Sequence, residues 1–123
     1  MKFYKCTTCG KIVAMINESA SGTVCCGSDM VELKAGTTDA VVEKHVPVVA
    51  VNGNSVSVSV GSVTHPMEEK HYIQWIAIET TQGFQLKDLQ PGQEPKALFS
   101  LTDGETVVKA YAYCNLHSLW ASN

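Results

Sequence analysis

The sequence predicts an all-β protein in which a small metal-binding knuckle precedes an antiparallel β-sandwich. Three observations predict this class. Short apolar runs rich in valine and isoleucine recur along the chain, with turn residues between them. No segment keeps the 3.6-residue period over the ~11 residues that an amphipathic helix needs. Four of the five cysteines gather near the start of the chain, as the ligands of one metal do.

Length, composition and charge restrict the class of protein. The chain has 123 residues, 45% of them hydrophobic, which is enough for one domain with a buried core and a small additional unit. A net charge of −3 and the absence of arginine argue against binding to nucleic acid, which needs a basic patch. No apolar run approaches the ~20 residues that span a bilayer, and residues 1–6 lack the apolar core of a signal peptide. We therefore expect a cytoplasmic protein with no membrane partner.

Residues 1–36 form the first predicted domain. Cys6 and Cys9 are separated by two residues, a spacing that lets two thiolates face one metal, and Gly10 allows the backbone to turn beneath them. The apolar, β-branched run 11–17 predicts a strand, and a turn-like segment follows it. So short a segment buries too little apolar surface to fold alone, and we expect a bound metal to supply the missing stability.

The first predicted metal site consists of four thiolates. Disulfides are not expected in a reducing compartment, and four thiolates bind zinc or iron tetrahedrally. A structural zinc knuckle is one interpretation. Adjacent cysteines are unusual for zinc, where a second C-x-x-C pair is commoner, so an iron centre is the alternative. The group consists of Cys6, Cys9, Cys25 and Cys26.

Residues 37–123 form the second predicted domain, and the small polar residues 36–39 form a linker at the boundary between the two domains. Residues 56–60 alternate between valine and serine, as a half-buried strand does, and Asn-Gly-Asn at 52–54 predicts a hairpin before them. The run 71–78 is long and rich in β-forming residues, so we expect it to be the central strand. About seven such strands predict an antiparallel sandwich. The other candidate strands are 46–51, 83–89, 97–101 and 106–113.

The histidines and the remaining cysteine form a second group of candidate ligands. Taken singly, each histidine has an ordinary interpretation as a loop or surface residue, and a lone cysteine is often a small buried hydrophobe. Three members of the group, however, sit at predicted strand–loop junctions, which lie close together at one end of a sandwich. A site of four nitrogens and one sulfur leaves the sixth position of an octahedral iron open for chemistry. We interpret the ligands of this iron as His45, His65, His71, Cys114 and His117.

The first domain resembles desulforedoxin, a small protein with a rubredoxin-like iron. The adjacent pair Cys25-Cys26 carries the resemblance, which covers about the first 36 residues. It implies that the four cysteines hold an iron that cycles between the ferric and ferrous states. It also implies a homodimer, because members of that family pair through this unit.

The second domain resembles superoxide reductase. With the desulforedoxin-like start, the whole chain resembles the two-iron form, desulfoferrodoxin, end to end and in order. One departure is Ser118, which stands where the family commonly has glycine; it affects the turn and leaves the ligands untouched. The resemblance implies an immunoglobulin-like sandwich. It rests on E-K-H-V-P at 43–47, H-P-M at 65–67, H-Y-I-Q-W-I at 71–76 and C-N-L-H-S-L-W at 114–120.

The resemblance also implies the roles of the ligands. The four imidazoles lie roughly in a plane around the iron, with the Cys114 thiolate below them. His117 binds through Nδ1, and the other three histidines bind through Nε2. The thiolate pushes electron density towards the position opposite it. The reaction implied is the one-electron reduction of superoxide to hydrogen peroxide, with a rubredoxin-like protein as the electron donor.

Two charged residues stand next to the ligand His45. Without the resemblance, Glu43 and Lys44 read as an exposed loop pair. The resemblance implies instead that Lys44 attracts the superoxide anion and helps to deliver a proton through water. It implies that Glu43 occupies the sixth position in the ferric resting state.

Two other classes of function compete with this interpretation. A non-catalytic two-iron electron-transfer protein would use both irons as relays. An iron that only relays electrons works better with all its coordination positions filled, and the open sixth position argues against this function. A zinc-stabilised β-sandwich could instead serve as an interaction module. Absorption separates the three, because a zinc protein is colourless and ferric–thiolate centres are not. The sequence leaves open whether the four-cysteine iron relays electrons or serves the structure.

Overall fold

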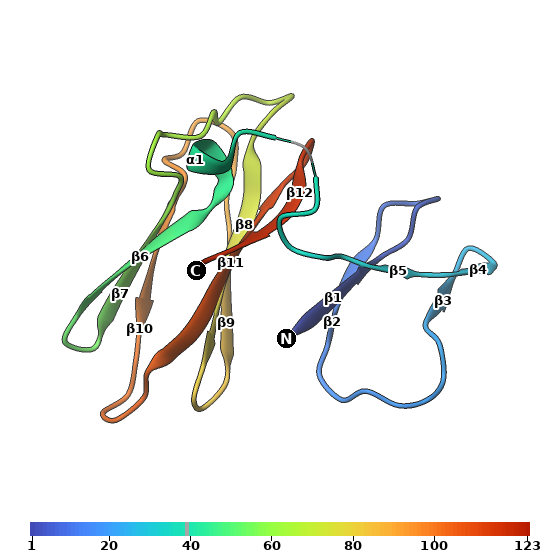
Figure 1. The fold of residues 1–123 in the computed structure, drawn as a ribbon, viewed down its shortest axis with the longest axis horizontal. Coiled ribbons are helices and arrows are strands. Elements are labelled where there is room, and N and C mark those ends of the chain that lie inside the picture. Colours follow the sequence, from blue (N-terminus) through green and yellow to red (C-terminus); the bar gives the residue numbers. More distant parts are fainter. Residues whose placement is uncertain (39) are drawn as a thin grey trace. The chain divides into compact units, whose positions relative to one another are not determined.

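The computed structural model describes residues 1–38 and 40–123 and divides the chain into two units, Met1–Lys34 and Ala35–Asn123 (Figure 1). Asp39, the last residue of the predicted linker, lies outside the described residues. No helix in the described ranges has the length and apolar character needed to cross a bilayer. The elements in chain order are β1 (Lys2–Lys5), β2 (Ile12–Met15), β3 (Val24–Cys25), β4 (Ser28–Asp29), β5 (Val31–Glu32), α1 (Val42–His45), β6 (Pro47–Asn52), β7 (Ser55–Val60), β8 (Ile73–Thr80), β9 (Phe84–Asp88), β10 (Lys96–Ser100), β11 (Val107–Cys114) and β12 (Ser118–Ala121).

The N-terminal unit consists of an antiparallel sheet in the order β2-β1-β5 and a separate hairpin of β3 and β4. The strand predicted at 11–17 is β2, which pairs with β1 so that Phe3 lies opposite Ala14. Phe3, Cys6 and Met30 are buried, whereas Ile16 is 86% exposed. Apolar burial in this unit is therefore small, as expected for a segment that depends on metal.

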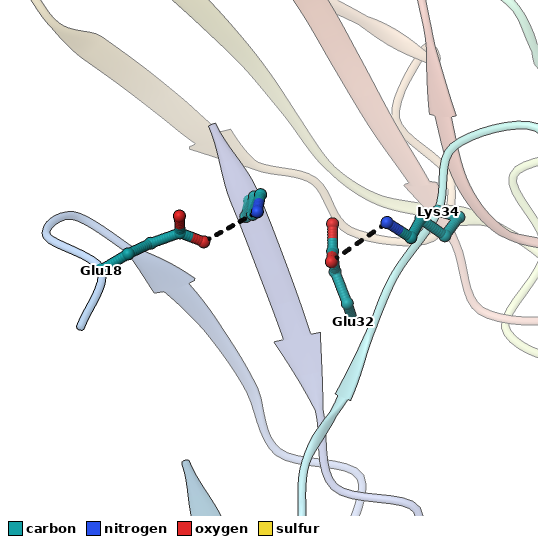
Figure 2. Close-up of polar contacts among 4 residues, drawn as sticks. Glu18, Glu32 and Lys34 are labelled. Atoms are coloured by element: carbon teal, nitrogen blue, oxygen red, sulfur yellow. Dashed lines mark ion pairs between the residues drawn. The ribbon is translucent and has the colours of Figure 1, made fainter. Parts of the chain in front are cut away.

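Two ion pairs accompany this small sheet (Figure 2). Lys2 pairs with Glu18 at 3.0 Å and Lys34 pairs with Glu32 at 3.1 Å. Three of these four side chains are about half exposed or more. Exposed ion pairs of this kind typically contribute less than about 1 kcal/mol, so they do not replace a core.

The second unit is an antiparallel sandwich of two sheets, in the orders β10-β7-β6 and β12-β11-β8-β9. Valines of β7 and Phe99 of β10 meet the isoleucines of β8 and the alanines of β11 in one buried core. The all-β class and the sandwich are thus confirmed. The predicted hairpin at 52–54 joins β6 to β7, and β8 lies inside its sheet between β11 and β9.

Two elements were not expected from the sequence. A single helical turn, α1, precedes β6, and β12 adds a fourth strand to the second sheet. The central strand also begins two residues later than predicted, at Ile73. His71 instead forms an isolated bridge with Glu68, so its backbone lies outside the β8 ladder.

One end of the sandwich gathers the segments that carry the histidines. Figure 1 shows α1, the connection from β7 to β8 and the turn from β11 to β12 at this end. Gly61 brings the connection against α1, where its amide donates to the carbonyl of Val46 and the amide of Val63 donates to that of Glu43. A Cβ at Gly61 would lie 2.7 Å from the Glu43 carbonyl oxygen, and its φ is +84°, so only glycine fits there.

Candidate metal centres

The four cysteines of the N-terminal unit converge on one point. Their sulfur atoms all lie within 4.8 Å of one another, and Cys9 Sγ lies 3.7 Å from Cys25 Sγ. Cys6 is buried, while Cys9 and Cys26 are exposed. The four residues predicted as one thiolate group are therefore brought together, with two of them open to solvent.

Two tight turns orient these sulfurs. Gly10 has a φ of +82°, which confirms that the backbone turns beneath Cys6 and Cys9. Cys26 and Gly27 are the central residues of the β3–β4 hairpin, and both have positive φ, 53° and 75°. A two-residue hairpin turn of type I′ requires this conformation at both positions. The adjacent cysteines can therefore face one metal because the second of them lies in the turn.

The thiols of this group differ in pKa. Hydrogen bonds from the backbone amides of Cys9 and Thr8 lower the pKa of the Cys6 thiol to about 6, although burial opposes them. Hydrogen bonds with neighbouring thiols raise the pKa of Cys25 and Cys26. Four thiolates so close together repel one another and need a cation at their centre.

The four histidines form a square at one end of the sandwich. Going round it, the ring centroids of His45, His65, His71 and His117 lie 4.6, 4.8, 5.2 and 4.9 Å from the next. Neighbouring rings are nearly perpendicular, at 76–89°. His45 and His71 face each other across the square at 6.5 Å with an interplanar angle of 28°. Imidazoles arranged in this way point their edges at a common centre.

Backbone carbonyls fix the tautomers of two of these rings. His45 Nδ1 lies 2.7 Å from the Val41 carbonyl oxygen and His65 Nδ1 lies 2.6 Å from that of Pro66. Since carbonyls only accept, both Nδ1 atoms carry hydrogen and donate it. Burial lowers the pKa of both rings, that of His65 to about 4, so both are neutral at pH 7 and their Nε2 atoms hold lone pairs.

These lone pairs face each other without a hydrogen between them. His45 Nε2 lies 3.1 Å from His65 Nε2 and 3.1 Å from His117 Nδ1. Nε2 of His71 is buried and has no hydrogen-bond partner among residues 1–38 and 40–123. Buried lone pairs in close contact are unfavourable unless a cation lies between them. The donor set therefore fits a metal.

Cys114 supplies the sulfur of this group. Its Sγ and the ligand nitrogens of His45, His65 and His71 all lie within 4.8 Å of one another, and Sγ lies 3.9 Å from His117 Nδ1. The residue is completely buried, and burial raises the pKa of its thiol. A buried thiolate needs a cation beside it, which a metal at this point would supply. All five residues predicted for this centre therefore lie around one candidate metal position.

Trp120 contacts this group and was not assigned a role from the sequence. Its indole ring stacks on the ring of His45, with centroids 5.0 Å apart, and its Nε1–H donates to the His117 carbonyl oxygen at 2.9 Å. One buried aromatic side chain thus contacts two histidines from distant segments. The signal in the sequence was a tryptophan three residues after His117, at a position that β12 brings back over the site.

Glu43 and Lys44 lie in α1, immediately before His45. Glu43 is exposed and lines a groove of about 850 Å³, formed by both apolar and polar residues, that includes none of the five residues of the histidine group. Lys44 is partly buried. Burial lowers the pKa of His45 and His71, and the positive charge of Lys44 lowers both further. The field of Lys44 therefore reaches the histidine square.

The whole chain matches two family models. The model for the desulfoferrodoxin N-terminal domain matches residues 1–33, and the model for desulfoferrodoxin matches residues 37–123. The four-cysteine group falls within the first match, and the histidines with Cys114 fall within the second. The two donor sets match the two iron sites of desulfoferrodoxin.

Relatives of known name and structure agree with these matches. A desulfoferrodoxin homolog from Archaeoglobus fulgidus is 48% identical over 122 residues, which is 99% of this chain and 96% of that one. The crystal structure of the superoxide reductase from Treponema pallidum has a TM-score of 0.84 and 38% identity, and the match covers 99% of this chain and 98% of that one.

A shorter protein resembles part of the chain. The superoxide reductase (1Fe-SOR) from Giardia intestinalis has a TM-score of 0.55 and 38% identity, and the match covers 65% of this chain and 95% of that one. This share is too large for the N-terminal unit alone, so most of the match lies in the sandwich unit. On its two family matches and its full-length relatives, the chain belongs to the desulfoferrodoxin family.

Proposed function

We propose that the protein is a superoxide reductase, which converts superoxide, one electron and two protons into hydrogen peroxide without forming dioxygen. The observation that carries the proposal is the square of four imidazoles with the buried Cys114 thiol beside it. Four nitrogens and one sulfur leave one position of a six-coordinate metal open. The names of the relatives from Treponema pallidum and Giardia intestinalis support the same activity.

In this proposal the sandwich unit holds one iron. The histidines at 45, 65, 71 and 117 would hold it, the first three through Nε2 and the last through Nδ1, together with the thiolate of Cys114. When bound, this iron supplies the single electron and the open position for superoxide. The carbonyls of Val41 and Pro66 support the assignment, because they hold His45 and His65 in the tautomer with a free Nε2.

We assign supporting roles to the two charged residues of α1. The protein is net negative, so capture of an anion needs a local positive charge, and the Lys44 ammonium supplies it. Lys44 also passes a proton towards the bound anion through water. Glu43 would be the carboxylate that takes the open position in the oxidised resting state and helps the product to leave, although in this structure its exposed side chain lines the groove outside the histidine group.

The second iron belongs to residues 1–36, where the cysteines at 6, 9, 25 and 26 hold it. This centre serves either as an electron relay or as the element that keeps the small unit folded. The exposure of Cys9 and Cys26 favours a relay, because an electron donor could approach their sulfurs directly. Residues 37–123 form the catalytic domain. We propose further that the donor is a rubredoxin-like protein, that the chain forms a homodimer and that it works in the cytoplasm.

Product analysis tests the proposed activity. The iron-loaded protein with an excess of reductant is supplied with superoxide, and hydrogen peroxide and dioxygen are both measured. We expect one peroxide for each superoxide consumed and no dioxygen. One dioxygen for each peroxide would identify a dismutase instead. A two-iron electron carrier would leave superoxide to decay at the rate seen without protein.

A further inference from the structure

Asn115 links the turn that carries Cys114 to the segment that carries His71. Its Oδ1 accepts a hydrogen bond from the Tyr72 amide at 3.0 Å, and its Nδ2 donates to the Lys70 carbonyl oxygen at 3.0 Å. Its own backbone amide donates to the Tyr72 carbonyl oxygen at 3.2 Å. The side chain thus holds the peptide groups immediately before and after His71, which lie more than 40 positions away in the sequence.

His71 differs from its neighbours in how its ring is held. The rings of His45 and His65 each donate to a backbone carbonyl, which fixes the direction of the ring as well as its tautomer. Among the described residues, no hydrogen-bond partner holds the His71 ring, and its Nε2 is buried and unpaired. The ring can therefore be aimed only through packing and through its own backbone.

The backbone of His71 is held from two sides. On one side it forms a bridge with Glu68, with hydrogen bonds of 2.9 and 3.0 Å. On the other side are the contacts that Asn115 makes with Lys70 and Tyr72. Because the bridge to Glu68 lies within one short loop, it cannot by itself fix the loop relative to the rest of the site. The β8–β11 ladder pairs Cys114 with Ile73, two residues beyond His71, and the contacts of Asn115 extend this link to the peptide groups on either side of His71.

From this geometry we infer that Asn115 is a positioning residue, which sets the direction of the His71 ring towards the metal and fixes it relative to Cys114. The inference rests on the proposed role of His71 as an iron ligand. It differs from a general stabilising role, because the effect of Asn115 on the metal should pass through His71. Without this clamp the His71 loop can shift, and a shifted ligand binds more weakly.

The test compares iron retention in full-length, iron-loaded variants. The rate at which an excess of chelator removes iron from the histidine centre is followed by the thiolate charge-transfer absorption of the oxidised protein. The variants are Asn115→Ala, His71→Ala and the double variant. Asn54→Ala is the matched control, because Asn54 also bridges two loops with its side chain, to Asp103 at 2.6 Å, in the hairpin at the far end of β6.

We expect Asn115→Ala to lose iron about tenfold faster than wild type, a typical effect of removing a group that orients a ligand, and Asn54→Ala to behave as wild type. The double variant should lose iron no faster than His71→Ala, because Asn115 then has no ligand to orient. Asn115→Ala should also broaden the electron paramagnetic resonance signal of the ferric centre. If Asn115→Ala does not fold, Asn115→Asp replaces it: its carboxylate still accepts from Tyr72 but cannot donate to Lys70, and it should retain iron less well than wild type.

Two results would overturn the inference. One is an Asn115→Ala protein that loses iron no faster than the Asn54→Ala control. The same result for Asn115→Asp counts if that variant has to replace Asn115→Ala. The other is a double variant in which the separate effects multiply, since Asn115 would then act independently of His71. A His71→Ala protein that retained iron as wild type does would instead contradict the ligand assignment in the proposed function. The two failures are therefore distinguishable.

Discussion

The two candidate metal centres of this chain are built on different kinds of support. The four cysteines of the N-terminal unit lie on strands of two to four residues and on their turns, and only Phe3, Cys6 and Met30 are buried there. The histidines and Cys114 lie at one end of a sandwich whose two sheets share a continuous core, and Cys114 belongs to that core. We therefore expect metal and fold to depend on each other in the first unit, and the fold of the second unit to position its ligands before metal binds.

Removing both metals should show the largest difference between the units. Under reducing, anaerobic conditions with a chelator, we expect β1, β2 and β5 to lose the protection of their amides against hydrogen exchange, because the unit has little other stabilisation. The amides of β8 and β11 should stay protected. Nuclear magnetic resonance of the metal-free and metal-loaded protein measures both. Amides in β1 that stayed protected without metal would show that the small sheet folds on its own.

The pH dependence of the metal-free sandwich should reveal the cost of burying its histidines. Burial lowers the pKa of His65 to about 4, against an ordinary value of 6.5. The unfolded chain therefore binds the proton more readily between these values, and the free energy of unfolding falls as the pH falls from about 6.5 towards 4. His65 alone accounts for a loss of at most about 3 kcal/mol at the lower limit.

Urea denaturation of the metal-free protein at a series of pH values measures this loss. His65→Gln should flatten the curve, because glutamine does not titrate, whereas the carboxylates titrate equally in both proteins. Curves of the same slope for wild type and His65→Gln would mean that the buried ring does not stay neutral. Bound metal should instead make the curve steeper, because the metal-bound rings and thiolate take up no proton, whereas the histidines and the thiol of the unfolded chain do so as the pH falls.

Lys44→Ala should slow the capture of superoxide five- to tenfold, which corresponds to about 1 kcal/mol of lost attraction for a partly exposed charge. Pulse radiolysis at several ionic strengths measures the second-order rate, which should fall with salt less steeply in the variant than in wild type. Lys44→Arg should keep most of the rate.

The matched control for this prediction is Lys109→Ala. It removes the same charge near the start of β11, whereas Cys114 lies at the end of that strand. If Lys44→Ala and Lys109→Ala captured superoxide equally fast, the net charge of the protein would explain the slower capture. The position of Lys44 next to His45 would then make no separate contribution.

Ser118→Gly should have the smallest effect, a gain in stability of a few tenths of a kcal/mol up to about 1 kcal/mol. Ser118 has a φ of +64°, a left-handed conformation that a residue with a Cβ adopts at a cost and glycine adopts freely. The greater freedom of glycine in the unfolded chain offsets part of the gain. Ser57→Gly, in the middle of β7, should instead destabilise the protein. A loss of stability in Ser118→Gly under the same denaturation assay would mean that the turn is not strained.

Much of the sandwich could be predicted because its signals are local. The alternation of valine and serine in β7 and the Asn-Gly turn before it are read from neighbouring residues, and both are confirmed. The single turn α1 is too short for a helical period to be visible, and β12 has only four residues. Because α1 carries His45 and β12 follows His117, the two elements that were not predicted lie next to the histidine group.

The ligand types could be predicted from the sequence, but their support could not. Four histidines and one unpaired cysteine suggest a metal group by composition alone. The carbonyl of Val41 that fixes His45, the stacking of Trp120 on that ring and the clamp of Asn115 on the His71 loop depend on chain segments brought together only by folding. No local pattern marks such contacts.

The most direct test of the comparison replaces one cysteine ligand in each centre in turn and measures the first reaction of the protein with superoxide. Pulse radiolysis is applied to the iron-loaded, reduced wild type, Cys9→Ser and Cys114→Ser. Cys9→Ser should lose the spectrum of the four-thiolate iron and keep the wild-type rate. Cys114→Ser should keep that spectrum and lose the charge-transfer band of the histidine centre together with most of the reaction. The opposite pattern, or a Cys114→Ser protein that reacts at the wild-type rate, would contradict the assignment of the reaction to the sandwich.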